Sequence, residues 1–286
     1  MSLQKNFYFL ARRFVAGETI DSAIAAVRRL NEQGMSATLD FLGEDVRRRD
    51  EALAQRDVYF EMLDAIAAAG VESNVSVKLS AMGLLVDEGF ARENLGAVVE
   101  RAARNPDPFV RIDMEGSAVL DATLRLFEQV FATHKNTGPV LQAYLKRTPG
   151  DVQRAIALGA RVRLCKGAYN EPPEIAYKRM PEIRERYLAL AQELLLRGVY
   201  PGIATHDRRL IAAVKRFVAD RAIASDRFEF QMLYGCRPRV ARELVAQGYR
   251  LRVYVPFGTH WSGYFYRRVL ERRENAVFAL SSIFSR

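Results

Sequence analysis

The chain of 286 residues contains few cysteines, few lysines and no long apolar run. Its two cysteines, Cys165 and Cys236, belong to no CxxC pair and to no His/Cys cluster, so we expect neither a disulfide framework nor a metal site. No stretch reaches the roughly 18 uncharged apolar residues of a transmembrane helix, and the N-terminal residues lack the apolar segment of a signal peptide. These absences predict a cytoplasmic protein without a membrane-spanning helix.

The usual phosphate-binding loops are also absent. No GxGxxG follows the first predicted strand and no GxxxxGK(S/T) occurs anywhere, so any nucleotide is expected to be held in another way. The formal net charge of +9 comes mainly from arginine, because only seven of the 43 basic residues are lysine. The arginines are scattered through predicted helices and form no stripe with interleaved aromatics, which argues against a nucleic-acid partner.

Short runs rich in Val, Ile, Leu and aromatic residues alternate with amphipathic helical stretches, a pattern typical of parallel strands joined by helices. Eight strands are expected, at 36–43, 74–80, 109–115, 139–145, 160–166, 201–206, 228–234 and 250–255. This pattern predicts an α/β fold, a (β/α)8 TIM-like barrel preceded by a helix at 19–33. An open doubly wound sheet is the alternative.

We expect one domain over residues 1–286, with an N-terminal helical extension at 1–35 and the barrel at 36–286. Gly70, Gly198 and Gly248 predict helix ends, and Asp151 predicts the start of a short helix. Pro181 interrupts the segment after the fifth strand, which predicts two helices in that connection.

Polar residues mark nearly every predicted strand end. The ends carry Asp40, Lys78, Asp113, Gln142, Lys166, His206, Gln231 and Tyr254. Active sites of such barrels lie at the carboxyl ends of the strands. One polar residue there is ordinarily a satisfied interior group, but eight in register are hard to explain as filler, because each desolvated polar group needs a partner.

The segment from Arg163 to Tyr169 is the sharpest of these ends. Strand alternation places Arg163 and Cys165 on one face and Leu164 and Lys166 on the other. Gly167 and Ala168 would then let the backbone approach a bulky ligand. Two cations here would stabilise the negative charge of a reduced flavin. The alternative interpretation is a strand with two structural salt bridges.

A predicted helix near the end of the chain carries Tyr264, Arg267, Arg268 and Glu271, whose spacing puts them on one face. Two guanidiniums can bind one carboxylate, a phenol supplies a flat wall and the Glu balances charge. The face is therefore suited to a small zwitterion, with a solvated basic surface as the alternative.

These segments together resemble the proline dehydrogenase family. The resemblance rests on 163–169, 204–207, 228–235, 254–258 and Tyr264 to Glu271, and on 11–17 and 40–44 nearer the start. The length is similar to that of the short, monofunctional bacterial members. The resemblance implies FAD-dependent oxidation of L-proline to Δ1-pyrroline-5-carboxylate by hydride transfer to flavin N5, the first step of proline catabolism. It also implies a membrane quinone as electron acceptor and peripheral contact with the inner face of the cytoplasmic membrane.

The resemblance also implies roles for individual residues. Substrate binding falls to Lys78, Tyr169, Leu233, Tyr254, Tyr264, Arg267, Arg268 and Glu271. Cofactor binding falls to Met114, Gln142, Arg163, Lys166, Gly167, Ala168, Thr205, His206 and Gln231. Asp113 and Arg163 are assigned to catalysis, Asp113 by supporting the pocket through a tyrosine or Lys78, and Arg163 by stabilising the reduced flavin. Asn170 stands where some relatives place a large aromatic, which leaves open how the adenine is held.

Two other functions remain open from the residues alone. A Schiff-base aldolase would use Lys78 or Lys166, because strand-end lysines of barrels suit that chemistry. A basic nucleic-acid-binding module would use the positive surface and would lose affinity steeply with salt.

Overall fold

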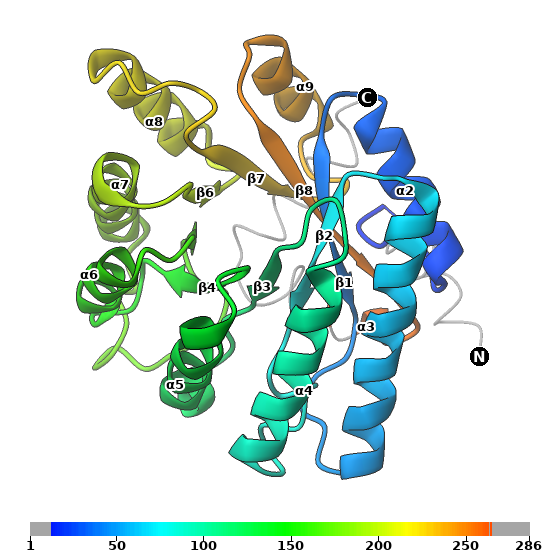
Figure 1. The fold of residues 1–286 in the computed structure, drawn as a ribbon. Coiled ribbons are helices and arrows are strands. Elements are labelled where there is room, and N and C mark those ends of the chain that lie inside the picture. The colour runs from blue at the N-terminus through cyan, green and yellow to red at the C-terminus, as the bar shows by residue number, and fades with distance from the viewer. Residues whose placement is uncertain (1–12, 263, 265–286) are drawn as a thin grey trace.

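The structure, a computed structural model, describes residues 13–262 and residue 264. Eight parallel strands close into a barrel in the order β1 to β8 (Figure 1). The strands are β1 (Ser36–Phe41), β2 (Ser73–Val77), β3 (Val110–Ile112), β4 (Thr137–Gln142), β5 (Arg163–Cys165), β6 (Gly202–Ala204), β7 (Glu229–Leu233) and β8 (Leu251–Phe257). Each coincides with a predicted strand, which confirms the predicted barrel. The first and last strands pair from Ser36↔Arg252 to Phe41↔Phe257, so the open-sheet alternative is wrong.

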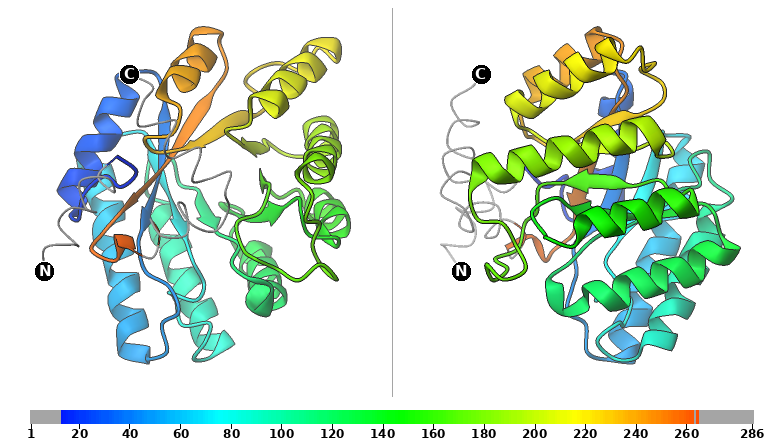
Figure 2. Two further views of the ribbon diagram at one scale, coloured as in Figure 1. Left: turned by 180° about the vertical axis from the view of Figure 1, so that it is seen from behind. Right: turned by 90° about the vertical axis from the view of Figure 1, so that its left-hand side faces the viewer.

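Helices follow the strands and cover the outside of the barrel, as Figures 1 and 2 show. They are α2 (Ile20–Asn31), α3 (Arg49–Ala69), α4 (Glu88–Ala102), α5 (Ser117–Thr133), α6 (Thr148–Leu158), α7 (Met180–Arg197), α8 (Arg208–Asp220) and α9 (Pro238–Ala246). The helix α2 precedes the barrel, as predicted. Its N-terminus is closed by Thr19 and Ser22, each of which accepts a hydrogen bond from the other's backbone N–H.

The helix ends differ from the sequence prediction in three places. Pro181 lies in the first turn of the single helix α7, so the predicted pair of helices is wrong. The missing N–H of a proline costs nothing there, because first-turn N–H groups have no acceptor within the helix. The helix α6 begins at Thr148, three residues before Asp151, and α9 ends at Ala246, shortly before Gly248. Gly70 and Gly198 end their helices as predicted.

The apolar core lies between the strands and the surrounding helices, whereas the barrel interior is strongly polar. A chain of ion pairs and hydrogen bonds runs through the interior from one mouth to the other. In order it joins Asp107, Arg252, Glu229, Gln231, Arg163, Asp113, Tyr254, Lys78 and Asp40. Barrels of this type usually fill the interior with branched apolar side chains. The buried charges here must therefore be held by one another, and they fix each other's orientation.

Candidate active site

Lys78 and Asp40 form a buried ion pair at the carboxyl-terminal mouth of the barrel. Lys78 directly follows β2, and Asp40 lies near the end of the neighbouring strand β1. The Lys78 Nζ lies 2.8 and 2.9 Å from the two Asp40 carboxylate oxygens. Asp40 is fully buried. Burial raises the pKa of Asp40 against the opposing effect of Lys78. Burial alone would lower the pKa of Lys78, but Asp40 and Asp113 outweigh it and hold that pKa above its ordinary value, so the lysine stays protonated.

Asp113 is the centre of this mouth. Its carboxylate accepts hydrogen bonds from Ser76 Oγ at 2.7 Å, from Tyr254 Oη at 2.8 Å and from Arg163 Nη1 at 2.9 Å. Lys78 Nζ lies 3.8 Å from the same carboxylate. Burial alone would raise the pKa of Asp113, but Arg163 and Lys78 lower it more, so Asp113 is ionised. Asp113 thus contacts both a tyrosine and Lys78, and its support of a proline pocket stays a prediction.

Tyr254 comes from β8 and reaches across the barrel to Asp113. Burial, together with the charge of Asp113, raises the pKa of its phenol well above the ordinary value. The phenol therefore remains protonated and can act only as a donor toward Asp113. Its ring also packs against a cation, because the Arg163 guanidinium carbon lies 5.3 Å from the ring centroid.

Arg163 begins β5 and points into the interior. Its Nε donates to Gln231 Oε1, and its Nη1 donates to Asp113 and, at 3.4 Å, to Ser76. The Nη2 group makes no hydrogen bond within the described residues. The guanidinium is thus fixed in place and keeps one N–H group for a ligand. The amide of Gln231, predicted to bind cofactor, is already engaged inside the barrel by Arg163 and Glu229.

Lys166 points to a different neighbourhood, the start of α8. Its Nζ lies 3.0 Å from Asp207 Oδ2, and Arg184 Nε lies 2.6 Å from the same oxygen. Asp207 caps α8 by accepting from the Arg209 N–H, and Thr205 Oγ1 accepts from the Asp207 N–H. Burial opposes these contacts, but Arg184 and Lys166 lower the pKa of Asp207 to about 2.

Two cations and a helix N-terminus therefore surround one carboxylate, which leaves an excess of positive charge suited to a phosphate. The salt-bridge alternative predicted for the segment is also met, because Arg163 and Lys166 both form ion pairs.

The loop after β5 explains why Gly167 is a glycine. Its φ is 128°, and a Cβ at this position would lie 2.2 Å from Cδ1 of Tyr144. Close packing against Tyr144 thus requires glycine here. The sequence alone suggests a different reason for this glycine, the approach of the backbone to a ligand. The next residue, Ala168, is exposed, and its N–H donates to Gln142 Oε1 at 3.2 Å. Gln142 ends β4, so this bond attaches the loop to the barrel.

The remaining predicted residues form walls around the mouth. Leu233 ends β7, and its N–H donates to His206 Nε2 at 2.9 Å, which ties the ends of β7 and β6 together. Tyr264 is buried in a small cluster with Val15 and Leu42, against which Tyr254 packs. Tyr169 is half-buried in the loop after β5, and Met114 is buried directly after β3. Arg267, Arg268 and Glu271 lie outside the described residues.

Several residues of the mouth were not assigned from the sequence. Asp40 balances Lys78, Ser76 donates to Asp113, and Asp207 links Lys166 to α8. Glu115 accepts hydrogen bonds from the backbone and side chain of Ser80, and burial raises its pKa. In the sequence, only their position could have identified Asp40 and Asp207 as site residues, since both stand at the ends of predicted strands.

Two further searches bear on the type of site. Within residues 13–262 and 264, no group of three or more His, Cys, Asp or Glu side chains is arranged to hold a metal ion. The helices of the same residues include none long and apolar enough to cross a membrane.

Known proteins resemble this chain along nearly its whole length. A model of the proline dehydrogenase family matches residues 23–280. Proline dehydrogenase 1 of Bacillus subtilis (strain 168) is 41% identical over 273 residues, which cover 96% of this chain and 90% of that protein. The proline dehydrogenase of Deinococcus radiodurans is 39% identical over 286 residues, which cover 98% and 92%.

A solved structure extends the likeness to the fold. The crystal structure of proline utilization A from Bdellovibrio bacteriovorus, inactivated by N-propargylglycine, matches with a TM-score of 0.88 at 27% sequence identity. The match covers 96% of this chain and 34% of that chain.

Proposed function

Because the chain belongs to the proline dehydrogenase family, we propose that it oxidises L-proline to Δ1-pyrroline-5-carboxylate with FAD as its cofactor and passes the electrons to a membrane quinone. The observation that carries this proposal is the cluster of Lys78, Asp113, Arg163 and Tyr254 at the carboxyl-terminal mouth. Each group is held in a defined charge state by its neighbours. Such a cluster can fix the orientation of a small charged substrate.

The donors of this mouth fit a flavin nucleotide. The Arg163 Nη2 group, which has no hydrogen-bond partner in the part of the chain that the structure describes, suits the polar edge of an isoalloxazine ring. The positive surroundings of Asp207 at the start of α8 suit a pyrophosphate. We assign the ring and ribityl group to Met114, Gln142, Arg163, Lys166 and Gln231, and the rest of the nucleotide to Gly167, Ala168, Thr205 and His206. When bound, the flavin supplies the acceptor for the hydride that leaves the proline carbon next to nitrogen.

The charge balance of the mouth indicates how proline would bind. Lys78 and Arg163 are offset by Asp40 and Asp113, so these four groups are neutral together. A substrate carboxylate therefore needs further cations, and we assign that role to Arg267 and Arg268 acting with Lys78. Glu271 would position one of these arginines.

The apolar ring of proline needs walls rather than charges. We assign these to Tyr169, Leu233, Tyr254 and Tyr264, of which Tyr254 is fixed by its bond to Asp113. Pinning the carboxylate at one end and enclosing the ring fixes the reacting carbon, so catalysis rests on positioning, to which Asp113 and Arg163 contribute by holding the cluster together.

The electron acceptor and the domain organisation belong to the same proposal. Delivery to a membrane quinone requires peripheral contact with the membrane, and the excess of arginine would favour an anionic lipid surface. We further propose that residues 1–286 act as one domain, with an N-terminal helical extension at 1–35 and a barrel at 36–286 whose C-terminal helix binds the substrate.

The aldolase alternative is disfavoured by the state of its lysines. A Schiff-base lysine needs a lowered pKa to be a free amine near neutral pH. The pKa of Lys78 is instead raised by Asp40 and Asp113 against the effect of burial, and Lys166 is ion-paired with Asp207.

The decisive experiment is a visible spectrum of the purified protein before and after anaerobic addition of L-proline. We expect a flavin absorption band that L-proline bleaches, with D-proline as the control that carries the same charges. Absence of the band, or a band that L-proline leaves unchanged, would contradict the proposal. Trapping of a carbonyl substrate by borohydride in a colourless protein would favour the aldolase.

A further inference from the structure

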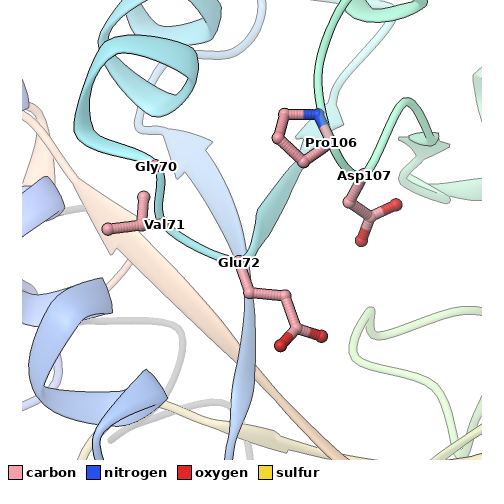
Figure 3. Close-up of a pocket in the computed structure, with 5 residues that line it drawn as sticks. All are labelled: Gly70, Val71, Glu72, Pro106 and Asp107. Atoms are coloured by element: carbon pink, nitrogen blue, oxygen red, sulfur yellow. The ribbon is translucent and has the colours of Figure 1, made fainter.

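A cavity of about 670 Å³ opens at the amino-terminal mouth of the barrel, the end opposite the candidate active site. Its lining includes Arg161, Tyr200, Arg250 and Arg252. A second cavity of about 380 Å³ shares Glu72 and Asp107 with it. Figure 3 shows these two side chains on neighbouring segments, with both carboxylates turned to the same side. The volume of the larger cavity falls within the range of small-molecule sites.

Arg161 is held in this mouth by aromatic rings, and no residue that the structure describes forms a hydrogen bond or salt bridge with its side chain. Its guanidinium carbon lies 4.3 Å from the ring centroid of Phe109 and 4.6 Å from that of Tyr200. Its Nε is buried and has no hydrogen-bond partner within residues 13–262 and 264. Burial lowers the pKa of Arg161, against the attraction of Glu229 and Asp107. Aromatic rings stabilise the charge but accept none of the N–H groups, and a buried donor without an acceptor is costly.

Arg250 also lies against Tyr200. Its Nη1 donates to the Tyr200 hydroxyl at 3.3 Å, and its guanidinium carbon lies 5.6 Å from the Tyr200 ring centroid. It forms no salt bridge with a carboxylate among the described residues. Tyr200 has a φ of 42°, in the left-handed region that a residue with a side chain rarely adopts. A strained backbone thus places one phenol near two arginines that have no carboxylate partner among the described residues.

Arg252, in the same mouth, is an example of an arginine with a purely structural role. Its Nε lies 2.8 Å from Glu229, its Nη2 lies 3.0 Å from Asp107, and its Nη1 donates to the Ala37 carbonyl oxygen. All three nitrogen atoms are engaged, in contrast to those of Arg161. The amino-terminal end of such a barrel usually serves stability. An arginine in that role is expected to have all its nitrogen atoms engaged, as Arg252 does.

The charges around the cavity also favour an anionic ligand. Arg111, which donates to the backbone oxygen of Arg161, has no acceptors among the described residues other than that oxygen and the Pro139 carbonyl oxygen. Burial and the nearby cations Arg163 and Arg161 hold the pKa of Arg111 well below its ordinary value. Asp107 and Glu229 are taken by Arg252, which leaves the exposed Glu72 as the other carboxylate in the described lining. Positive charge therefore exceeds negative charge around the cavity.

We propose that this cavity binds a small organic anion through a carboxylate or phosphate group, which accepts hydrogen bonds from Arg161 and Arg250 beside Tyr200. Carboxylates and phosphates match the fork of arginine donors, and the guanidiniums of Arg161 and Arg250 both line the cavity. The site is separate from the proposed proline pocket and does not rest on the proposed function.

The test is calorimetric titration of the purified full-length protein at low ionic strength with glutarate in one arm and inorganic phosphate in the other. We expect saturable binding of at least one probe, weakened about tenfold or more in Arg161→Gln and in Arg250→Gln. The matched control is Arg242→Gln, which removes the same charge from an exposed position on α9 and should leave binding unchanged.

The two arms separate the ligand classes, because a response to glutarate alone identifies a carboxylate site and a response to phosphate alone a phosphate site. If Arg161→Gln does not fold, Arg250→Gln decides the matter, since Arg250 is exposed. No saturable binding of either probe, or equal weakening by Arg242→Gln, would overturn the proposal.

Discussion

The hydroxyl of Tyr254 on β8 donates a 2.8 Å hydrogen bond to Asp113 after β3, so one bond crosses the barrel at the candidate active site. Asp113 also accepts from Ser76 and Arg163, and it lies 3.8 Å from the Lys78 Nζ. The position of the tyrosine ring and the position of the lysine are thus linked through one carboxylate. This linkage is the basis for the first prediction.

Tyr254→Phe should raise the KM for proline by about tenfold while the flavin content stays the same, because the wall remains but Asp113 loses a donor that orients it. The free energy of unfolding should fall by about 1–2 kcal/mol. The matched control is Tyr59→Phe, which removes a buried hydroxyl that donates to the Ser76 carbonyl oxygen at 2.7 Å outside the pocket. That control should lose stability without a change in KM. Steady-state kinetics and denaturant unfolding measure both effects, and an unchanged KM in Tyr254→Phe would refute the linkage.

The pair of Lys78 and Asp40 should be strongly coupled in stability. Lys78→Met or Asp40→Asn alone should cost about 3–5 kcal/mol, because each leaves a buried charge without its partner. The double variant should be more stable than the sum predicts, with a coupling of at least about 2 kcal/mol in a double-mutant cycle. The exposed pair of Arg239 and Glu243 is the control, with an expected coupling of about 0.3–0.5 kcal/mol.

The same variants distinguish an effect on stability from an effect on substrate binding. Rescue of stability in the double variant should not rescue proline binding, because the cation assigned to the substrate carboxylate is still missing. A double variant with an ordinary KM would show that Lys78 serves only to balance Asp40.

The barrel could be predicted from the sequence because its signals are local. Each strand is a short apolar run bounded by polar or turn residues, and Thr19 and Gly70 mark helix ends by their own chemistry. Pro181 misled the prediction because its effect depends on position within the helix. In the first turn it is favourable, and in the interior it would have divided the segment.

The partners of the polar residues could not be predicted in the same way. Asp40 and Lys78 are 38 positions apart and meet only because β1 and β2 pair in a particular register. The ion pair of Glu229 and Arg252 depends likewise on the register of β7 and β8. Spacing along the chain carries no such information, so strand ends identified candidate residues but not which of them touch.

Gly167→Ala should destabilise the protein by at least about 2 kcal/mol, since it adds a Cβ 2.2 Å from Tyr144 at a φ of 128°. We also expect a lower flavin content, because Ala168 and Lys166 would be displaced with the loop. Gly150→Ala in α6 is the control, because nothing lies within 4 Å of its added Cβ. Its stability should match or slightly exceed that of the wild type. Equal stability of the two variants would contradict the packing argument.

Arg268→Met should raise the KM for proline greatly and leave the flavin content intact, because it removes a bidentate contact to the substrate carboxylate. The helical spacing predicted from the sequence puts Arg273 on the face opposite Tyr264 and Arg268, so Arg273→Met is the matched control and should bind proline normally. Kinetics together with the flavin absorbance measures both properties. Loss of flavin from Arg268→Met would mean that this residue holds the cofactor rather than the substrate.

Asp207 should stabilise the folded protein in a pH-dependent way. Its pKa of about 2 lies below the ordinary value of 3.8, so its ionised form is favoured by folding. The contribution is fully present above about pH 4 to 5 and is lost as the pH falls through 2. Asp207→Asn should therefore cost about 1–2 kcal/mol near pH 7, allowing for solvent screening. The gap between variant and wild type should shrink to about half by pH 3.

Denaturant unfolding between pH 7 and pH 3 measures this gap for Asp207→Asn. Asp57→Asn, which removes a carboxylate from an exposed pair with Arg56, is the control and should change stability by less than about 0.5 kcal/mol at every pH. A gap that stays constant down to pH 3 would contradict the prediction, because Asn can still accept the Arg209 N–H and only the charge of Asp207 differs between the two proteins. The flavin content of Asp207→Asn tests a separate role, because a carboxylate that places Lys166 and Arg184 for a phosphate should lower the flavin content when its charge is removed.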